Sequence, residues 1–172
     1  MAGESDKKGN IDDGVEIYMD LNKALQNGNW NAAKEFLNRH PHAISAKITV
    51  RGKTALYVAA EAGHVHIVEE LVKQMSEENL EIKDIYGFTA LARAAYNGNY
   101  RIAECMLGKN ENLTSIGDDG NIPVVLALFN GHLKLARYLY LLTPPEILLP
   151  ENGTMGASVV FEAIDNKALG KN

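Results

Sequence analysis

Apolar residues along the chain follow a helical spacing, in blocks that return at nearly constant intervals. In residues 64–72 they stand at i, i+1, i+4 and i+5, counted from Ile67. The same spacing returns in residues 99–107 and again in residues 132–140. Because this spacing places the apolar side chains on one face of an α-helix, each block is predicted to be an amphipathic helix.

A second block, rich in small residues, precedes each of these helices. Residues 54–63 read TALYVAAEAG, residues 89–98 read TALARAAYNG 35 positions later, and residues 122–131 read IPVVLALFNG a further 33 positions on. Alanines let neighbouring helices lie close together, and the closing glycine can end a helix because it adopts positive φ without strain. Each repeat is therefore predicted to be two short helices separated at a glycine.

Weaker copies flank these three repeats. Residues 21–37 match the first clear copy at an offset of 35, and residues 156–164 match residues 87–95 at an offset of 69. Thr143 to Gly153, marked by prolines, is predicted to be one unusually long connection. The boundaries expected from this pattern are a disordered tail over 1–16, a repeat domain over 17–164 with repeats at about 17–49, 50–83, 84–116, 117–150 and a partial 151–169, and a tail over 165–172.

Composition fits a folded domain and excludes several classes of protein. Of the 172 residues, 46% are hydrophobic and 23% are charged, which is ordinary globular usage. The net charge of −5 and the absence of a basic stripe argue against nucleic acid as a partner. No run of 18 apolar residues occurs, so direct membrane insertion of this chain is not expected.

The residues that most often carry chemistry do not form a recognisable catalytic or metal-binding pattern. Cys105 is the single cysteine, which excludes an internal disulfide and fits a reducing compartment such as the cytoplasm. The pairs His40/His42 and His64/His66 lack a neighbouring carboxylate or thiol with ligand spacing. We therefore predict no catalytic residue, no cofactor and no metal site.

The repeated blocks resemble the ankyrin consensus of the form D-x-x-G-x-T-P-L-H-x-A-A-x-x-G-H-x-x-I-V-x-x-L-L. The residues that match it are Gly52, Thr54, Leu56, Ala59, Ala60, Gly63, His64, Ile67, Val68 and Leu71 in one copy, and Asp84, Gly87, Thr89, Leu91, Ala94, Ala95, Gly98 and Ile102 in the next. The resemblance implies an all-α solenoid of helix-turn-helix repeats with short β-turn or hairpin tips. It also implies a non-enzymatic role in binding proteins, and hydrogen bonds from His64 and His132 that brace the neighbouring turns.

Some residues depart from that consensus, and others are similar to a narrower group within the family. Tyr57, Ala92 and Val125 stand where the consensus has histidine. The wording of residues 29–34 and 120–127 resembles plant ankyrin proteins whose longer members carry a C-terminal membrane domain of the PGG type and act in defence and stress signalling. The sequence thus leaves open a cytoplasmic adaptor, or a regulatory domain at the cytosolic face of a membrane within a longer protein.

The family resemblance also indicates where a partner binds, because tip loops and first helices line the concave face of such a stack. Aromatic side chains there combine a large contact area with a low entropy cost, so they are expected to anchor the interface. Charged residues at the rim are expected to set specificity. The predicted partner-binding residues are Val50, Arg51, Lys53, Glu61, Ile85, Tyr86, Phe88, Tyr96, Asn97, Asp118, Asp119, Asn121, Phe129 and Asn130, with Gln26 and Asn27 from the first copy.

The sequence does not name the partner, so alternatives remain. A protein partner is favoured, and a metal-binding protein or an enzyme is the less favoured reading. The incomplete last copy also leaves the oligomeric state open between a monomer and weak self-association through the C-terminal end.

Overall fold

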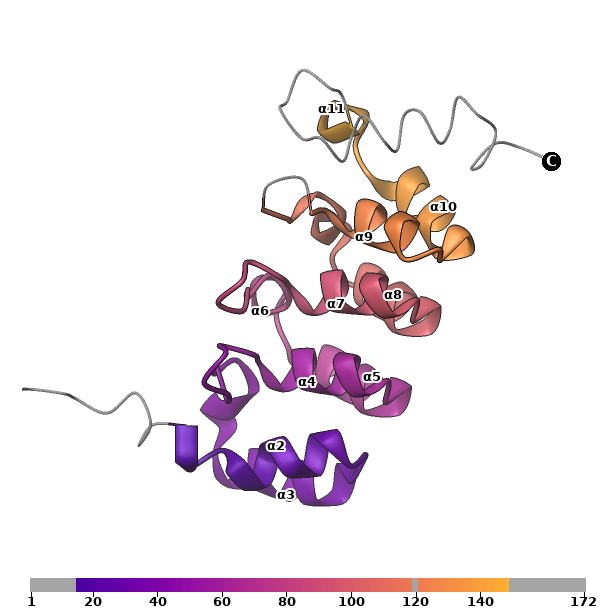
Figure 1. Cartoon of the computed structure of the whole chain (residues 1–172). Helices are drawn as coiled ribbons and strands as arrows, with labels where there is room; N and C mark the ends of the chain where they lie inside the picture. Colours follow the sequence, from indigo (N-terminus) through magenta and orange to yellow (C-terminus); the bar gives the residue numbers. More distant parts are fainter. Residues whose placement is uncertain (1–14, 119–120, 149–172) are drawn as a thin grey trace, which may run out of the picture.

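The computed structural model describes residues 15–118 and 121–148, and in this part of the chain helix pairs stack one upon another (Figure 1). The pairs are α2 (Met19–Gln26) with α3 (Trp30–Arg39), α4 (Ala55–Ala62) with α5 (Val65–Gln74), α7 (Ala90–Asn97) with α8 (Tyr100–Leu107), and α9 (Pro123–Phe129) with α10 (Leu133–Leu142). The predicted all-α solenoid of ankyrin type is confirmed, and the helix pairs fall where the repeated blocks placed them.

A short helical turn follows the second helix of each pair, which the sequence pattern did not predict. These turns are η1 (Pro41–Ile44), α6 (Glu77–Leu80), η2 (Glu111–Ser115) and α11 (Pro145–Leu148). The connection that begins at Thr143 was predicted only as a long segment marked by prolines, and it opens with α11 as the other connections open with their own turns. A turn of four or five residues is too short to show a helical period, so the prolines dominated the prediction.

Side-chain caps and left-handed glycines set the limits of the first helices. The Thr54 hydroxyl accepts a hydrogen bond from the Tyr57 amide at 3.2 Å, and Thr89 does the same for Ala92 at 3.2 Å. Gly63 and Gly98 end α4 and α7 with φ of 81° and 72°, a conformation in which other residues are strained. The predicted glycine turns are confirmed, and the structure adds the threonine caps.

The core runs along the stack as a row of closely packed first helices. Helix α4 packs against α2 and α7, and α7 packs against α9. The alanines at this row are fully buried, namely Ala59, Ala60, Ala94, Ala95 and Ala127. Larger side chains at these positions would overpack the contact between repeats.

Histidine and asparagine side chains link each helix pair to the one before it. His64 Nε2 lies 3.0 Å from the Gln26 carbonyl oxygen, and His132 Nε2 lies 3.0 Å from that of Tyr96. In the repeat between them Asn99 donates to the Ala60 carbonyl at 3.4 Å. The predicted bracing by His64 and His132 is confirmed, and these bonds fix the register of neighbouring repeats.

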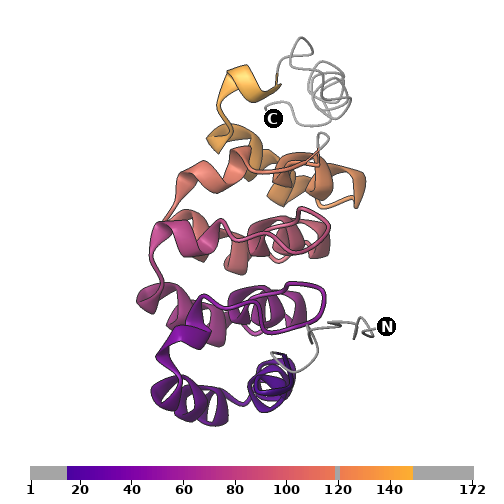
Figure 2. The ribbon, with the colours of Figure 1, turned by 90° about the vertical axis from the view of Figure 1, so that its left-hand side faces the viewer.

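The loops that precede α4 and α7, residues 47–54 and 82–89, project to one side of the stack, and we call them the tip loops (Figure 1). Figure 2 looks onto this side, where the loops lie one above the other. The Ile85 amide donates to the Arg51 carbonyl at 3.0 Å, which joins the two loops. Lys83 Nζ lies 2.6 Å from Asp118 Oδ1 of the following repeat. The tip loops and the first helices together form one continuous surface, here called the inner face.

Candidate functional site

Most of the predicted binding residues lie exposed on the inner face. On the tip loops Val50 is 65% exposed, and Ile85 and Tyr86 are each 60% exposed. At the ends of α7 and α9, Tyr96 is 47% and Phe129 is 65% exposed. The remaining exposed residues of the set are Gln26, Asn27, Arg51, Asn97, Asp118, Asn121 and Asn130.

Three members of the set are less exposed than these. Lys53, Glu61 and Phe88 are half-buried, and Phe88 packs against the hydrophobic core. The aromatic ring of Phe88 is held between neighbouring repeats, so it serves stacking as well as any contact with a partner. Asp119 lies outside the described residues.

A group of polar side chains spans the junction between α4 and α7, and we call Lys53, Tyr57, Glu61 and Arg93 the charged cluster. Lys53 Nζ lies 2.5 Å from Glu61 Oε2, and Arg93 Nε lies 3.4 Å from Glu61 Oε1. Arg93 Nε also donates to the Tyr57 hydroxyl at 3.2 Å. Because Arg93 comes from the next repeat, the cluster ties two repeats together across the inner face.

Tyr57 is the buried centre of the charged cluster. Its side chain is 1% exposed, and this burial raises the pKa of the phenol to about 12. The hydrogen bond from Arg93 acts in the opposite direction, while the Asp84 carboxylate adds to the rise. Lys53 and Arg93 also lie over the Tyr57 ring, with Nζ 5.2 Å and Cζ 5.7 Å from its centroid. The phenol therefore stays neutral and packs as an aromatic spacer.

A hollow of about 390 Å³ opens at the next junction, between α7 and α9. It is lined by Phe88, Ala92, Arg93, Tyr96, Asn121 and Leu126. Most of these walls are apolar, and Arg93 Cζ stands 5.3 Å from the centroid of the Tyr96 ring at one edge. A hollow with apolar walls and a few polar groups at its rim is suited to receive an apolar side chain.

The hollow and the charged cluster occupy equivalent positions of successive repeats. At the offset of 35, Lys53 corresponds to Phe88, Tyr57 to Ala92 and Glu61 to Tyr96; at the offset of 33, Arg93 corresponds to Leu126. The phenol of Tyr57 fills the first junction, whereas the methyl group of Ala92 leaves the same space open at the second. The hollow thus follows from a large-to-small replacement between repeats.

Sequence reasoning missed four of the residues that shape this surface. Tyr57 and Ala92 were noted only as departures from the consensus, and Arg93 and Leu126 were not selected. The sequence contains a signal for Arg93, because this residue is a cation inside an alanine-rich first helix. Comparing the repeats position by position, rather than each with a consensus, finds all four.

The other candidates for chemistry have packing roles in the structure. The His40 ring lies 4.7 Å from that of Phe36, and the His42 ring lies 6.3 Å from that of Tyr18. Cys105 is half-buried, and burial raises the pKa of its thiol, which disfavours the reactive thiolate. In residues 15–118 and 121–148, no three His, Cys, Asp or Glu side chains are grouped to hold a metal ion.

No helix in the described part of the chain has both the length and the apolar character that crossing a membrane requires.

Comparison with known proteins gives a family match over more than half of the chain. The family described as ankyrin repeats (3 copies) matches residues 21–116, from α2 to the start of the fourth repeat. This range contains the charged cluster and one wall of the hollow.

Three relatives, one from an animal and two from a plant, are each matched over a small part of their own length. Ankyrin repeat and SAM domain-containing protein 6 of Rattus norvegicus is 29% identical over 122 residues, which are 70% of this chain and 14% of that protein. Ankyrin repeat-containing protein ITN1 of Arabidopsis thaliana is 35% identical over 72 residues, 42% of this chain and 12% of that protein. A second ankyrin repeat-containing protein of Arabidopsis thaliana is 31% identical over 98 residues, 55% of this chain and 19% of the relative. The chain therefore spans less than a fifth of each of these proteins.

Proposed function

The chain belongs to the ankyrin-repeat family, and on that premise we propose that it is a protein-interaction scaffold whose partner seats an apolar side chain in the hollow between α7 and α9. The observation that carries this proposal is the hollow itself, about 390 Å³ of space with apolar walls on the face where such stacks bind. The exposed side chains of the tip loops extend the apolar surface beside it.

The energetics favour an interface in which one buried side chain of the partner supplies most of the binding free energy and the surrounding residues add contact area. Burying a leucine or an aromatic side chain is worth about 1.5–3 kcal/mol, which is the scale of a binding hot spot. Tyr96 and Phe88 line the hollow with aromatic rings, and Ala92 sets its depth. Val50, on the neighbouring tip loop, adds contact area at the edge of a separate hollow of about 330 Å³.

The decisive experiment fills the hollow from within. The substitution Ala92→Tyr restores at this junction the side chain that Tyr57 supplies at the previous one. Tagged wild-type protein and this variant are used to capture partners from plant extract, and captured proteins are quantified by mass spectrometry. Partners that use the hollow are expected to fall at least roughly tenfold with the variant, since one hot spot is worth about 1.4 kcal/mol or more.

A matched control separates loss of binding from loss of fold. Arg101→Tyr places the same aromatic side chain at an exposed position of α8, away from the hollow. This control is expected to capture the wild-type set and to keep the wild-type thermal midpoint. Ala92 is only 1% exposed, so the Ala92→Tyr capture is carried out well below the thermal midpoint of that variant, at a temperature where circular dichroism shows it folded. If Ala92→Tyr folds and captures every partner at the wild-type level, the hollow is not the anchor and the proposal is wrong.

We further propose that the scaffold acts in plant defence or stress signalling in the cytoplasm, or at the cytosolic face of a membrane as part of a longer protein. The Arabidopsis relatives support a plant setting, and the resemblance of residues 29–34 and 120–127 to plant ankyrin proteins supports the signalling role. A transcript in which the reading frame continues into several apolar helices would favour the membrane-bound form. Uniform cytoplasmic fluorescence of the tagged full-length product would favour the adaptor.

A further inference from the structure

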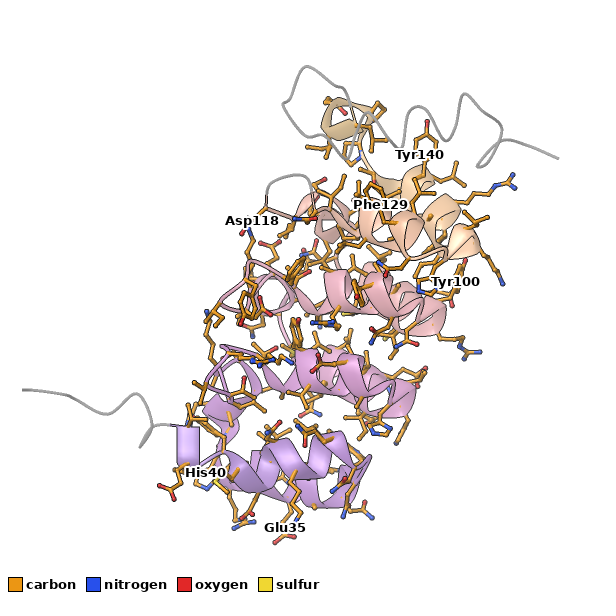
Figure 3. All side chains as sticks on the ribbon, viewed as in Figure 1. Glu35, His40, Tyr100, Asp118, Phe129 and Tyr140 are labelled. Carbon is orange, nitrogen blue, oxygen red and sulfur yellow. The ribbon has the colours of Figure 1, made fainter. Side chains whose placement is uncertain are left out.

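The last described helix pair, α9 with α10, presents an apolar surface at the end of the stack, away from α7 and α8. We call this surface the end face and define it by Leu128, Leu133 and Tyr140. Each of its residues can be compared with the equivalent residue of the three preceding repeats, where the next repeat covers that position. Figure 3 shows Tyr140 on this side of α10.

Leu128 stands at a position that is closed in every earlier repeat. Its counterparts Leu25, Ala60 and Ala95 are all 0% exposed, whereas Leu128 is only partly buried. Leucine at this position has more apolar surface to cover than the two alanines, not less. Leu128 is therefore the kind of apolar residue expected in an internal repeat, which has a neighbour on both sides, rather than in a terminal repeat that faces water.

Tyr140 shows the same difference in the second helix. Its counterparts Leu37, Val72 and Leu107 are 5%, 6% and 2% exposed, and Tyr140 is half-buried. The position is reserved for buried apolar groups in the three repeats before it.

Leu133 lacks the cover that its counterpart in the third repeat receives. The counterpart, Tyr100, is half-buried because the Tyr138 ring lies 5.0 Å from its own ring and Lys134 Nζ lies 4.9 Å from its centroid. Leu133 is 50% exposed. A terminal repeat normally carries polar residues on its outer side, so this end face requires an occupant.

We propose that residues 156–164 of this chain form the first helix of a fifth half-repeat that packs on the end face. Their offset of 69 from residues 87–95 places Ser158 at the capping position of Thr89 and Val160 at that of Leu91. Ala163 falls at the position of the buried Ala94. The segment thus carries the cap, the apolar contact and the small residue that first helices of this stack use.

The spacing of the chain supports the same register. Counted from the end of each short turn, the residue before the next first helix lies 10 positions on at Thr54, 9 positions on at Thr89 and 7 positions on at Ile122. Ser158 lies 10 positions after Leu148, the end of α11, which equals the longest of these spacings. The connection is therefore long enough to place the segment on α9 as α9 is placed on α7.

Hydrogen exchange of the full chain tests the proposal. Val160→Asp puts a charge at the position that is buried in the counterpart Leu91, and is expected to raise amide exchange in α9 and α10 by roughly tenfold while α2 and α3 stay unchanged. Asn166→Asp adds the same charge at a position whose counterpart Asn97 is exposed, and is expected to leave exchange as in the wild type.

A milder variant and a mass measurement complete the test. Ser158→Ala removes only the capping hydroxyl, and is expected to raise exchange in α9 by about fivefold, the usual scale for a lost cap. This variant decides the question if Val160→Asp loosens the whole chain. Unchanged exchange in α9 with Ser158→Ala overturns the proposal. Light scattering that shows a wild-type dimer, with α9 protected only at dimer concentrations, also overturns it, because a second copy then covers the end face.

Discussion

Two successive junctions between repeats, that of α4 with α7 and that of α7 with α9, have the same backbone arrangement. Their surfaces on the inner face differ, because one is closed by polar contacts and the other is an open apolar hollow. At the first, Tyr57, Glu61 and Arg93 join the two repeats through hydrogen bonds and ion pairs. At the second, Ala92 and Tyr96 line an open apolar hollow. The interior of both junctions is alike, with fully buried alanines at each step.

This difference shows that stacking and surface chemistry are controlled by separate positions of the repeat. The buried alanines, glycine turns and threonine caps hold the helices in register whatever the inner face carries. The inner positions are therefore free to hold either a closed polar contact or an unfilled apolar space. Polar groups that are already hydrogen-bonded within the chain gain little binding free energy from a partner. An unfilled apolar hollow, in contrast, favours binding because an apolar side chain can be buried in it.

The largest expected effect comes from making the first junction like the second. Tyr57→Ala removes the buried aromatic spacer and leaves Arg93 without its hydroxyl partner. Loss of a large aromatic from a packed site costs about 3–5 kcal/mol. Urea denaturation followed by circular dichroism measures the change in unfolding free energy.

The exposed Tyr86 provides the matched comparison, since it sits on a tip loop at 60% exposure. Tyr86→Ala is expected to change stability by less than about 0.5 kcal/mol. If Tyr57→Ala costs no more than Tyr86→Ala, the charged cluster is not the element that holds the first junction closed.

The fold could be predicted from the sequence because the same types of residue recur in the same order in successive repeats. Thr54 and Thr89 mark where first helices start, and Gly63 and Gly98 mark where they end. The spacing of the apolar positions identifies the second helices. The short turns such as α6 could not be predicted in this way, since four residues show no period. Their position depends on how the second helix ends against the next repeat.

The candidate site could be predicted only in outline. The tip loops and helix ends were identified correctly as exposed, because a repeat pattern tells which positions packing does not use. Phe88 was predicted to bind a partner and is half-buried, since its ring lies at the junction that Ala92 leaves open. The hollow depends on two repeats together, so no single repeat reveals it.

A smaller effect is expected from ionising the centre of the charged cluster. The folded pKa of Tyr57 is about 12, above the unfolded value of about 10, so the folded state favours the neutral phenol. Stability from this group is therefore complete below pH 10 and is lost as the pH rises through 12. A two-unit difference corresponds to about 2–3 kcal/mol.

Denaturation of the wild type and of Tyr57→Phe across pH 8–12 isolates this contribution. The wild type is expected to lose about 2–3 kcal/mol more than the variant over the range. Tyr86→Phe, at an exposed position, is expected to follow the wild type. Parallel curves for the wild type and Tyr57→Phe would contradict the assignment of the raised pKa to this phenol.

The smallest effect is expected at the exposed counterpart of the cluster, the ion pair of Lys83 with Asp118. It also joins two neighbouring repeats, and its atoms approach to 2.6 Å, but its side chains are 37% and 55% exposed. Water and salt screen such a pair, so Asp118→Asn is expected to cost about 0.2–1 kcal/mol. In 1 M salt, where screening acts within about 3 Å, the difference from the wild type is expected to vanish.

Glu61→Gln, which breaks the half-buried pairs of the cluster, is expected to retain most of its cost in the same salt. If both variants respond to salt alike, burial is not what separates the two contacts, and the charged cluster owes its strength to Tyr57 packing alone.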